Sequence, residues 1–73
     1  MFSKKQIIEG FVTNKRSQTV HSRGFGIIYY VTIGTKELLV SAQNYKILSK
    51  GDYVTALYKR GGMFDNEILV RIL

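Results

Sequence analysis

The amino-acid sequence predicts an all-β domain, a small five-stranded barrel with one short helix. Three observations support this fold class. Short segments rich in β-branched and aromatic residues recur along the chain, and glycine-containing turns separate them. One segment, 40–54, carries helical spacing, because Tyr45 and Leu48 lie three residues apart. The 73 residues contain no proline, linker or internal repeat, which indicates a single domain over residues 1–73.

Residues 7–16 predict the first strand, because they alternate partly and include β-branched and aromatic side chains. Gly10 inside this segment predicts a bend or a bulge, which small barrels need where a strand turns a corner. The polar residues that follow leave two alternatives: the strand runs on through Val20, or a loop begins at Ser17. Residues 23–26 form the turn in either case.

Residues 27–33 predict the second strand and residues 36–41 the third, with residues 34–35 as the hairpin turn. The second strand is apolar on both faces, which is typical of a covered strand or of one with a functional outer face. One face carries Ile27, Tyr29, Val31 and Ile33, and the other carries Ile28, Tyr30 and Thr32. In the third strand Leu38 and Val40 share a face.

The segment 40–54 predicts the end of a strand, one or two helical turns, a tight turn and the start of the next strand. Tyr45 and Leu48 then point from the helix into the core. Gly51 supplies the backbone freedom that ends the helix, and the Asp52 side chain bonds amides of the turn.

Residues 53–59 predict the fourth strand and residues 67–73 the fifth, with a glycine-led loop over residues 60–66. Alternation of side chains places Val54, Ala56 and Tyr58 on one face of the fourth strand. In the fifth strand it predicts Ile68, Val70 and Ile72 as the inner face.

The order of these elements places the helix between the third and fourth strands, as in the oligonucleotide/oligosaccharide-binding barrel, or OB-fold. An SH3-like barrel has its short helix between the last two strands. The sequence therefore favours an OB-fold-like barrel. An SH3-like barrel is the alternative if residues 7–22 hold two strands instead of one.

Several short segments of the chain also resemble a known family. They are Gly10-Phe11-Val12, Tyr30-Val31-Thr32-Ile33, Val40-Ser41, Tyr45, Leu48 and Gly51-Asp52-Tyr53-Val54. Together they resemble small bacterial, archaeal and phage β-barrel domains, OB-fold-like and of unknown function, some of which stand behind a membrane anchor. The resemblance covers residues 8–58. Its residues occupy strand, turn and helix-packing positions, so it implies a fold and no catalytic role.

The formal net charge is +6 and is concentrated in the first half of the chain. Residues 1–36 hold six basic residues against one acidic residue, a net charge of +5, whereas residues 37–73 hold +1. Such a bias fits a polyanionic partner, most often nucleic acid, and it also fits plain solubility. The sequence has no cysteine, no signal-peptide core and no membrane span, which predicts a cytoplasmic protein.

The sequence shows no pattern for catalysis. Its five carboxylates are scattered, His21 is the only histidine, and no nucleophile or phosphate-binding motif is present. Without cysteine there is no thiolate metal site. We therefore expect a non-enzymatic domain without a metal or a cofactor, and His21 as an ordinary loop residue.

The basic and aromatic residues predict a nucleic-acid interface. In an OB-fold the loop between strands one and two and the loop between strands four and five flank one binding face. These are the loops 16–26 and 60–66, and each combines guanidinium groups with an aromatic ring, which is what single-stranded nucleic acid requires. We predict binding of single-stranded DNA or RNA with little sequence specificity. The predicted interface residues are Lys15, Arg16, Arg23, Phe25, Tyr30, Lys36, Lys59, Arg60 and Phe64.

Within this set Tyr30 is expected to form a platform on the outer sheet face, and the lysines to extend a basic track. Phe25 and Phe64 have an alternative role as plugs of the barrel ends.

Other functions fit the sequence as well. A protein-interaction or accessory module would use an exposed sheet edge, or a patch of Tyr30, Leu39 and Leu57, to bind a protein partner or a second copy. Contact with an anionic membrane or an acidic ligand would instead use Lys4, Lys5 and the basic loops.

Overall fold

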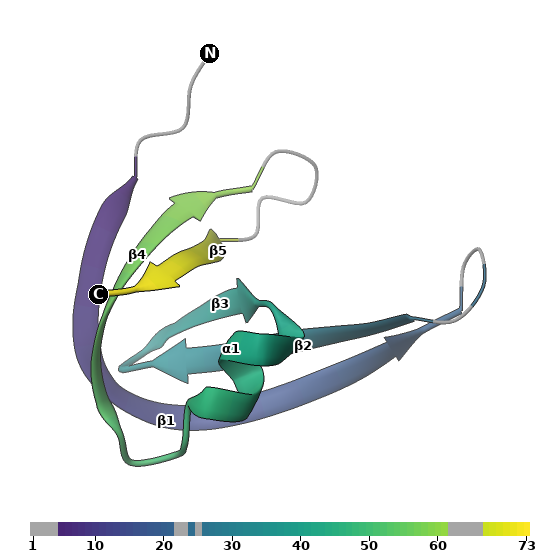
Figure 1. Cartoon of the computed structure of the whole chain (residues 1–73), viewed down its shortest axis with the longest axis horizontal. Helices are drawn as coiled ribbons and strands as arrows, with labels where there is room; N and C mark the ends of the chain where they lie inside the picture. Colours follow the sequence, from purple (N-terminus) through teal and green to yellow (C-terminus); the bar gives the residue numbers. More distant parts are fainter. Residues whose placement is uncertain (1–4, 22–23, 25, 62–66) are drawn as a thin grey trace.

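The computed structural model describes residues 5–21, 24, 26–61 and 67–73 (Figure 1). Five strands and one short helix make up these residues. They are β1 (Gln6–Val20), β2 (Gly26–Ile33), β3 (Lys36–Val40), α1 (Ala42–Ile47), β4 (Tyr53–Arg60) and β5 (Glu67–Ile72). The predicted all-β class and the place of the helix between the third and fourth strands are confirmed.

The strands form one sheet that closes on itself in the order β1-β2-β3-β5-β4. The β3–β5 pair is parallel and the other four pairs are antiparallel. β1 is a single continuous strand, so residues 17–20 extend it and the condition for an SH3-like barrel is not met. Its residues 6–11 pair with β4, and from Val12 onward it pairs with β2. β1 thereby belongs to both sides of the ring.

Gly10 precedes the point where β1 changes partners. A Cβ atom on Gly10 would lie 3.5 Å from Cγ2 of Ile33, so the residue packs closely against the β2–β3 turn region. The register of β1 against β2 then shifts between Val12 and Asn14, which marks a β-bulge at Thr13. β1 keeps its register with β4 through Gly10, so the bulge predicted as one alternative for Gly10 is not found there and lies three residues further along.

The core lies inside the ring. Its buried residues come from all five strands and from the segment after α1, and they are Val12, Val31, Ile33, Leu38, Val40, Leu48, Ala56, Tyr58 and Leu69. The residues predicted to share one face in the second, third and fourth strands face the core, except Ile27, which is 45% exposed because it lies beyond the end of β3.

The predicted inner face of the fifth strand is partly wrong. Leu69 is buried in place of Ile68 and Val70, whereas Ile72 does pack against the core. The register between β4 and β5 shifts between Leu57 and Tyr58, and this bulge interrupts the strict alternation on which the prediction relied.

The segment after β3 closes one end of the ring. Ser41 caps α1 by accepting a hydrogen bond from the amide of Asn44 at 3.2 Å, and Leu48 is buried after the last turn. The helix ends before Leu48, so the prediction that Gly51 ends it is wrong. Gly51 instead adopts φ 95° in the turn before β4, a conformation that favours glycine.

This turn is fastened to β1. Asp52 accepts a hydrogen bond from the amide of Ser49 at 3.0 Å, as predicted. The amide of Gly51 donates to the carbonyl of Val12, and the amide of Val12 donates to the carbonyl of Asp52, each at 2.8 Å. The α1–β4 turn thus substitutes for a strand beside β1 at the position where β1 leaves β4.

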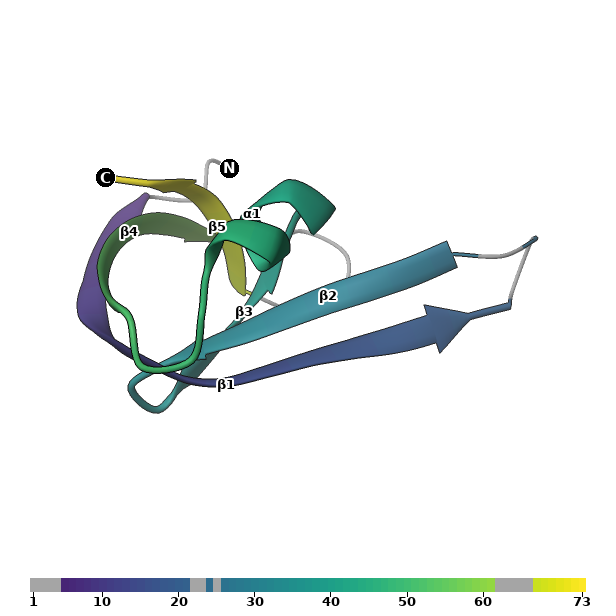
Figure 2. The ribbon, with the colours of Figure 1, turned by 60° about the horizontal axis from the view of Figure 1, so that its bottom comes forward.

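β1 and β2 continue side by side out of the ring as a two-stranded arm (Figure 2). We call residues 14–20 and 26–32 the arm; its inner part, where β2 pairs with β3 and Val31 is buried, still belongs to the ring. β3 pairs with β2 only as far as Tyr29, so the outer part of the arm has no third strand. Because both arm strands are extended, successive side chains lie on opposite faces, one continuous with the outside of the ring and one facing α1.

Candidate nucleic-acid interface

The bulge at Thr13 determines which arm residues face outward. Val12 pairs with the inward-facing Ile33, but after the bulge Lys15 pairs with the inward-facing Val31 and Arg16 pairs with Tyr30. Without the extra residue, Arg16 would share the face of Val12. The bulge therefore places Arg16 and Tyr30 together on the outer face, where the sequence predicted the Tyr30 platform.

Arg16 is held in place by two neighbours on that outer face. Its guanidinium carbon lies 4.0 Å from the centroid of the Tyr30 ring. Its Nε donates to Oε2 of Glu37 at 2.7 Å, and its Nη2 donates to Oε1 at 3.0 Å. Glu37 is on β3, so the contact joins all three strands of this face. Arg16 was predicted both as the last residue of the first strand and as the first residue of the loop 16–26, and the structure places it within β1.

Glu37 balances the charge of Arg16. The hydrogen bonds from Arg16 lower the pKa of Glu37 and raise the pKa of Arg16, so both groups are charged at neutral pH. The side chains remain 46% and 38% exposed, so solvent screens their attraction. Two of the five N–H groups of a guanidinium suffice for Glu37, which leaves the others for a second acceptor such as a phosphate oxygen.

The opposite face of the arm carries a second cation on an aromatic ring. Nζ of Lys15 lies 4.3 Å from the centroid of Tyr45 on α1, and the Tyr45 and Tyr29 rings lie 4.7 Å apart. All three side chains are half-buried. No carboxylate pairs with Lys15 among the residues that the structure describes. Lys15 therefore adds positive charge to the arm, on the face that Tyr30 does not share.

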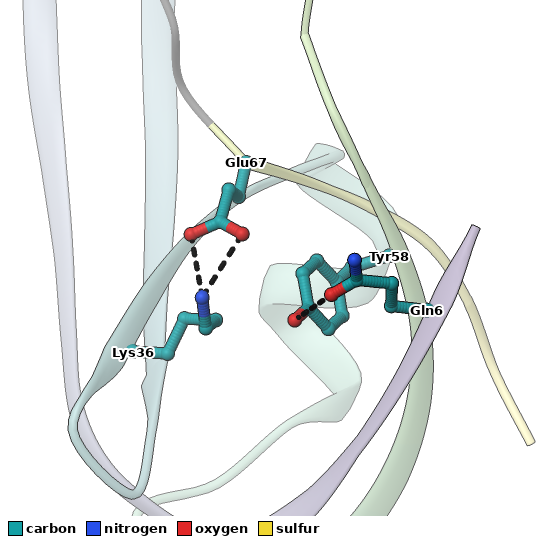
Figure 3. Close-up of polar contacts among 4 residues, drawn as sticks. All are labelled: Gln6, Lys36, Tyr58 and Glu67. Atoms are coloured by element: carbon teal, nitrogen blue, oxygen red, sulfur yellow. Dashed lines mark hydrogen bonds and ion pairs between the residues drawn. The ribbon is translucent and has the colours of Figure 1, made fainter. Parts of the chain in front are cut away.

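Lys36 is part of a polar cluster at the other end of the ring (Figure 3). Its Nζ donates to both carboxylate oxygens of Glu67, at 2.7 and 2.9 Å, and lies 5.1 Å from the centroid of Tyr58. The Tyr58 hydroxyl donates to Oε1 of Gln6 at 2.7 Å. The hydrogen bond to Glu67 raises the pKa of Lys36. Lys36 lies two residues before Leu38 and pairs with Ile33, so it shares their inward face and does not extend a track from Tyr30 on the outer face.

Two of the remaining predicted residues lie on β4, away from the arm. Lys59 is exposed on β4, opposite Ile68 of β5, and Arg60 ends β4 opposite Glu67. Three further predicted residues, Arg23, Phe25 and Phe64, lie outside the described residues. Of the predicted set, the described part of the chain thus brings Arg16 and Tyr30 together on the outer face of the arm and places Lys15 on its opposite face.

Sequence reasoning missed two members of this region. Tyr45 was expected only as a core residue, yet its ring also makes a cation–π contact with Lys15. Glu37 was overlooked because its partner is 21 positions away. Arg16 pairs with Tyr30 and Glu37 pairs with Thr32, so the strand registers would have placed Glu37 near Arg16. The β1–β2 register, however, depends on the bulge at Thr13. Within the described ranges, the His, Asp and Glu side chains form no cluster of three suited to a metal ion.

Comparisons with models of protein families, with curated proteins and with solved structures gave no match. The resemblance to small β-barrel domains therefore stays a prediction from the sequence. Within the residues described, α1 is the sole helix, and its six residues are far fewer than the roughly 20 that a membrane crossing requires.

Proposed function

We propose that the chain is an OB-fold-like, non-enzymatic module that binds single-stranded nucleic acid on the outer face of the arm and of β3. The strand order β1-β2-β3-β5-β4, with α1 between β3 and β4, supports the OB-fold part of this proposal. In that fold the face of strands two and three is a common site for oligonucleotides. Arg16, Tyr30 and Glu37 lie on this face.

The observation that carries the proposal is the fixed stack of Arg16 on Tyr30. The Arg16 guanidinium is held in one orientation by its two hydrogen bonds to Glu37, so it has lost most of its conformational freedom before a ligand binds. A base stacks on such a plane, and the N–H groups that Glu37 leaves over bind a phosphate. Neither contact reads the identity of a base, so the module binds with little sequence preference.

Charge along the arm favours a polyanion. Residues 14–21 contain Lys15, Arg16 and His21 and no carboxylate, so Glu37 of β3 is the acidic group closest in register to this segment. Lys15, on the face toward α1, attracts the phosphate backbone of a nucleic acid to the arm. Among the described residues no carboxylate pairs with it.

The test of this function is a fluorescence-polarisation titration against single-stranded DNA, single-stranded RNA and duplex DNA at two salt concentrations. We expect the single strands to bind more tightly than the duplex. The logarithm of the affinity should fall with the logarithm of salt by about 0.7 for each phosphate contact. Binding that is absent at low salt, or that does not change with salt, would contradict the proposal.

A variant that removes the competing carboxylate should bind more tightly. Glu37→Gln keeps the shape of the acceptor but frees the charge of Arg16. We expect a several-fold gain in affinity for single-stranded DNA at low salt, and a salt slope steeper by about 0.7. The readout is the same titration.

Glu9→Gln is the matched control, because it changes the net charge equally but lies on the part of β1 that pairs with β4. We expect it to change the affinity little. If the two variants gain affinity equally, total charge alone governs binding, and the outer face of the arm is not the site.

A further inference from the structure

The outer face of the β1–β4 ladder carries apolar side chains that the core does not use. Ile7, Phe11 and Tyr53 are 65%, 57% and 58% exposed. Ile7 pairs with Leu57 and Phe11 pairs with Tyr53 across the ladder. The Phe11 and Tyr53 rings meet edge to face, with centroids 5.0 Å apart. We call Ile7, Phe11, Tyr53 and Leu57 the β1–β4 patch.

Charged groups are distributed unevenly along this patch. Lys5 and Lys59 are both exposed. They lie at one end of the ladder, next to the Gln6–Tyr58 pair, Lys5 just before Gln6 and Lys59 just after Tyr58 in the chain. The two aromatic rings occupy the opposite end. Glu9 lies between these ends, and its negative charge raises the pKa of Tyr53. Along the strands the face therefore changes from cationic to aliphatic, then acidic, then aromatic.

We propose that this patch binds a second copy of the chain. In a face-to-face dimer with a twofold axis perpendicular to the strands, the cationic end of one copy covers the aromatic end of the other. Lys59 then lies over Tyr53 of the second copy, which is a favourable cation–π contact. The aliphatic side chains Ile7 and Leu57 fill the middle of the interface.

Charge also selects the orientation of the two copies. With the strands of the two copies parallel, Lys59 would meet Lys5 of the second copy and the interface would be repulsive. In the antiparallel arrangement Lys5 lies near Glu9 of the second copy, and the lysine ammonium attracts the Glu9 carboxylate. A polyanion or an anionic lipid surface would instead leave Glu9 against negative charge. The second copy is thus the occupant that gives Lys5, Lys59 and Glu9 each a favourable neighbour, while Arg71 of β5, opposite Leu57, is a further exposed cation at the edge of the patch.

Sedimentation velocity from micromolar to millimolar protein tests the proposal. We expect the wild type to dimerise as concentration rises and Ile7→Lys to raise the dissociation constant about tenfold or more. The matched control is Ile47→Lys on α1, an isoleucine that is 60% exposed and outside the patch. We expect this variant to dimerise like the wild type. Circular dichroism confirms that each variant is folded.

A charge exchange tests the orientation. Lys59→Glu and Tyr53→Lys should each weaken the dimer, and the double variant should dimerise more tightly than either, because opposite charges then face each other. A wild type that is monomeric at all concentrations contradicts the proposal, and so does an equal effect of the two isoleucine variants. Sedimentation of monomeric wild type with anionic phospholipid vesicles would assign the patch to a membrane instead. Nuclease treatment excludes association through nucleic acid.

Discussion

Leu38→Ala should lower the free energy of unfolding by about 2–5 kcal/mol. Leu38 is fully buried on β3 and belongs to the core. Its truncation removes apolar contacts and leaves a cavity that the closed ring cannot collapse around. A domain of this size has a stability on the order of 5 kcal/mol, so we expect a strongly destabilised or unfolded protein at room temperature. Urea unfolding followed by circular dichroism measures the change.

Leu39→Ala is the control within the same strand. Leu39 is half-buried on the outer face, opposite Tyr30, and does not belong to the core. We expect a loss of about 1 kcal/mol or less. Similar losses in the two variants would show that the inner and outer faces of β3 are assigned incorrectly.

Arg16→Glu should weaken binding of single-stranded DNA by about tenfold to a hundredfold. The substitution removes the cation from the Tyr30 ring and sets a second carboxylate beside Glu37. Loss of one stacking contact alone is worth about 1–3 kcal/mol, and the reversed charge adds repulsion of phosphate. Because Arg16 and Glu37 are largely exposed, thermal unfolding should change little. The polarisation titration used for the wild type measures the effect.

The same charge reversal on another strand separates the site from the total charge. Arg71 is exposed on β5, opposite Leu57 and away from the arm. Arg71→Glu should weaken binding much less than Arg16→Glu. Equal losses would mean that binding follows net charge and that the stack on Tyr30 has no particular part in it.

Much of the fold could be predicted from the sequence because local signals agree with the final structure. β-branched and aromatic segments between glycine turns located the five strands, and the spacing of Tyr45 and Leu48 located the helix. Their order along the chain favoured the observed place of α1. These features depend on residues close together in sequence, which is where pattern reasoning is strongest.

The candidate site could be predicted less well, because it depends on register. The bulge at Thr13 exchanges the faces of the sheet on which all later side chains of β1 lie. No residue type in that segment predicts this bulge. Lys15 therefore faces α1 although it was grouped with Arg16. Lys36 was assigned to the same track, but alternation on β3 turns it toward Tyr58 and Glu67. Composition identified the cations, whereas backbone pairing decided their partners.

The double membership of β1 has a consequence for the order in which the chain assembles. Its second half meets β2 through a local hairpin, for which the entropy of loop closure is modest. Its first half meets β4, where Gln6 lies 52 residues from Tyr58 along the chain. Pairing the first half of β1 with β4 costs more conformational entropy of the unfolded chain than closing the hairpin. Topologies with such distant pairings fold slowly. We therefore expect closure of the ring by β1 and β4 to be the slow step of folding.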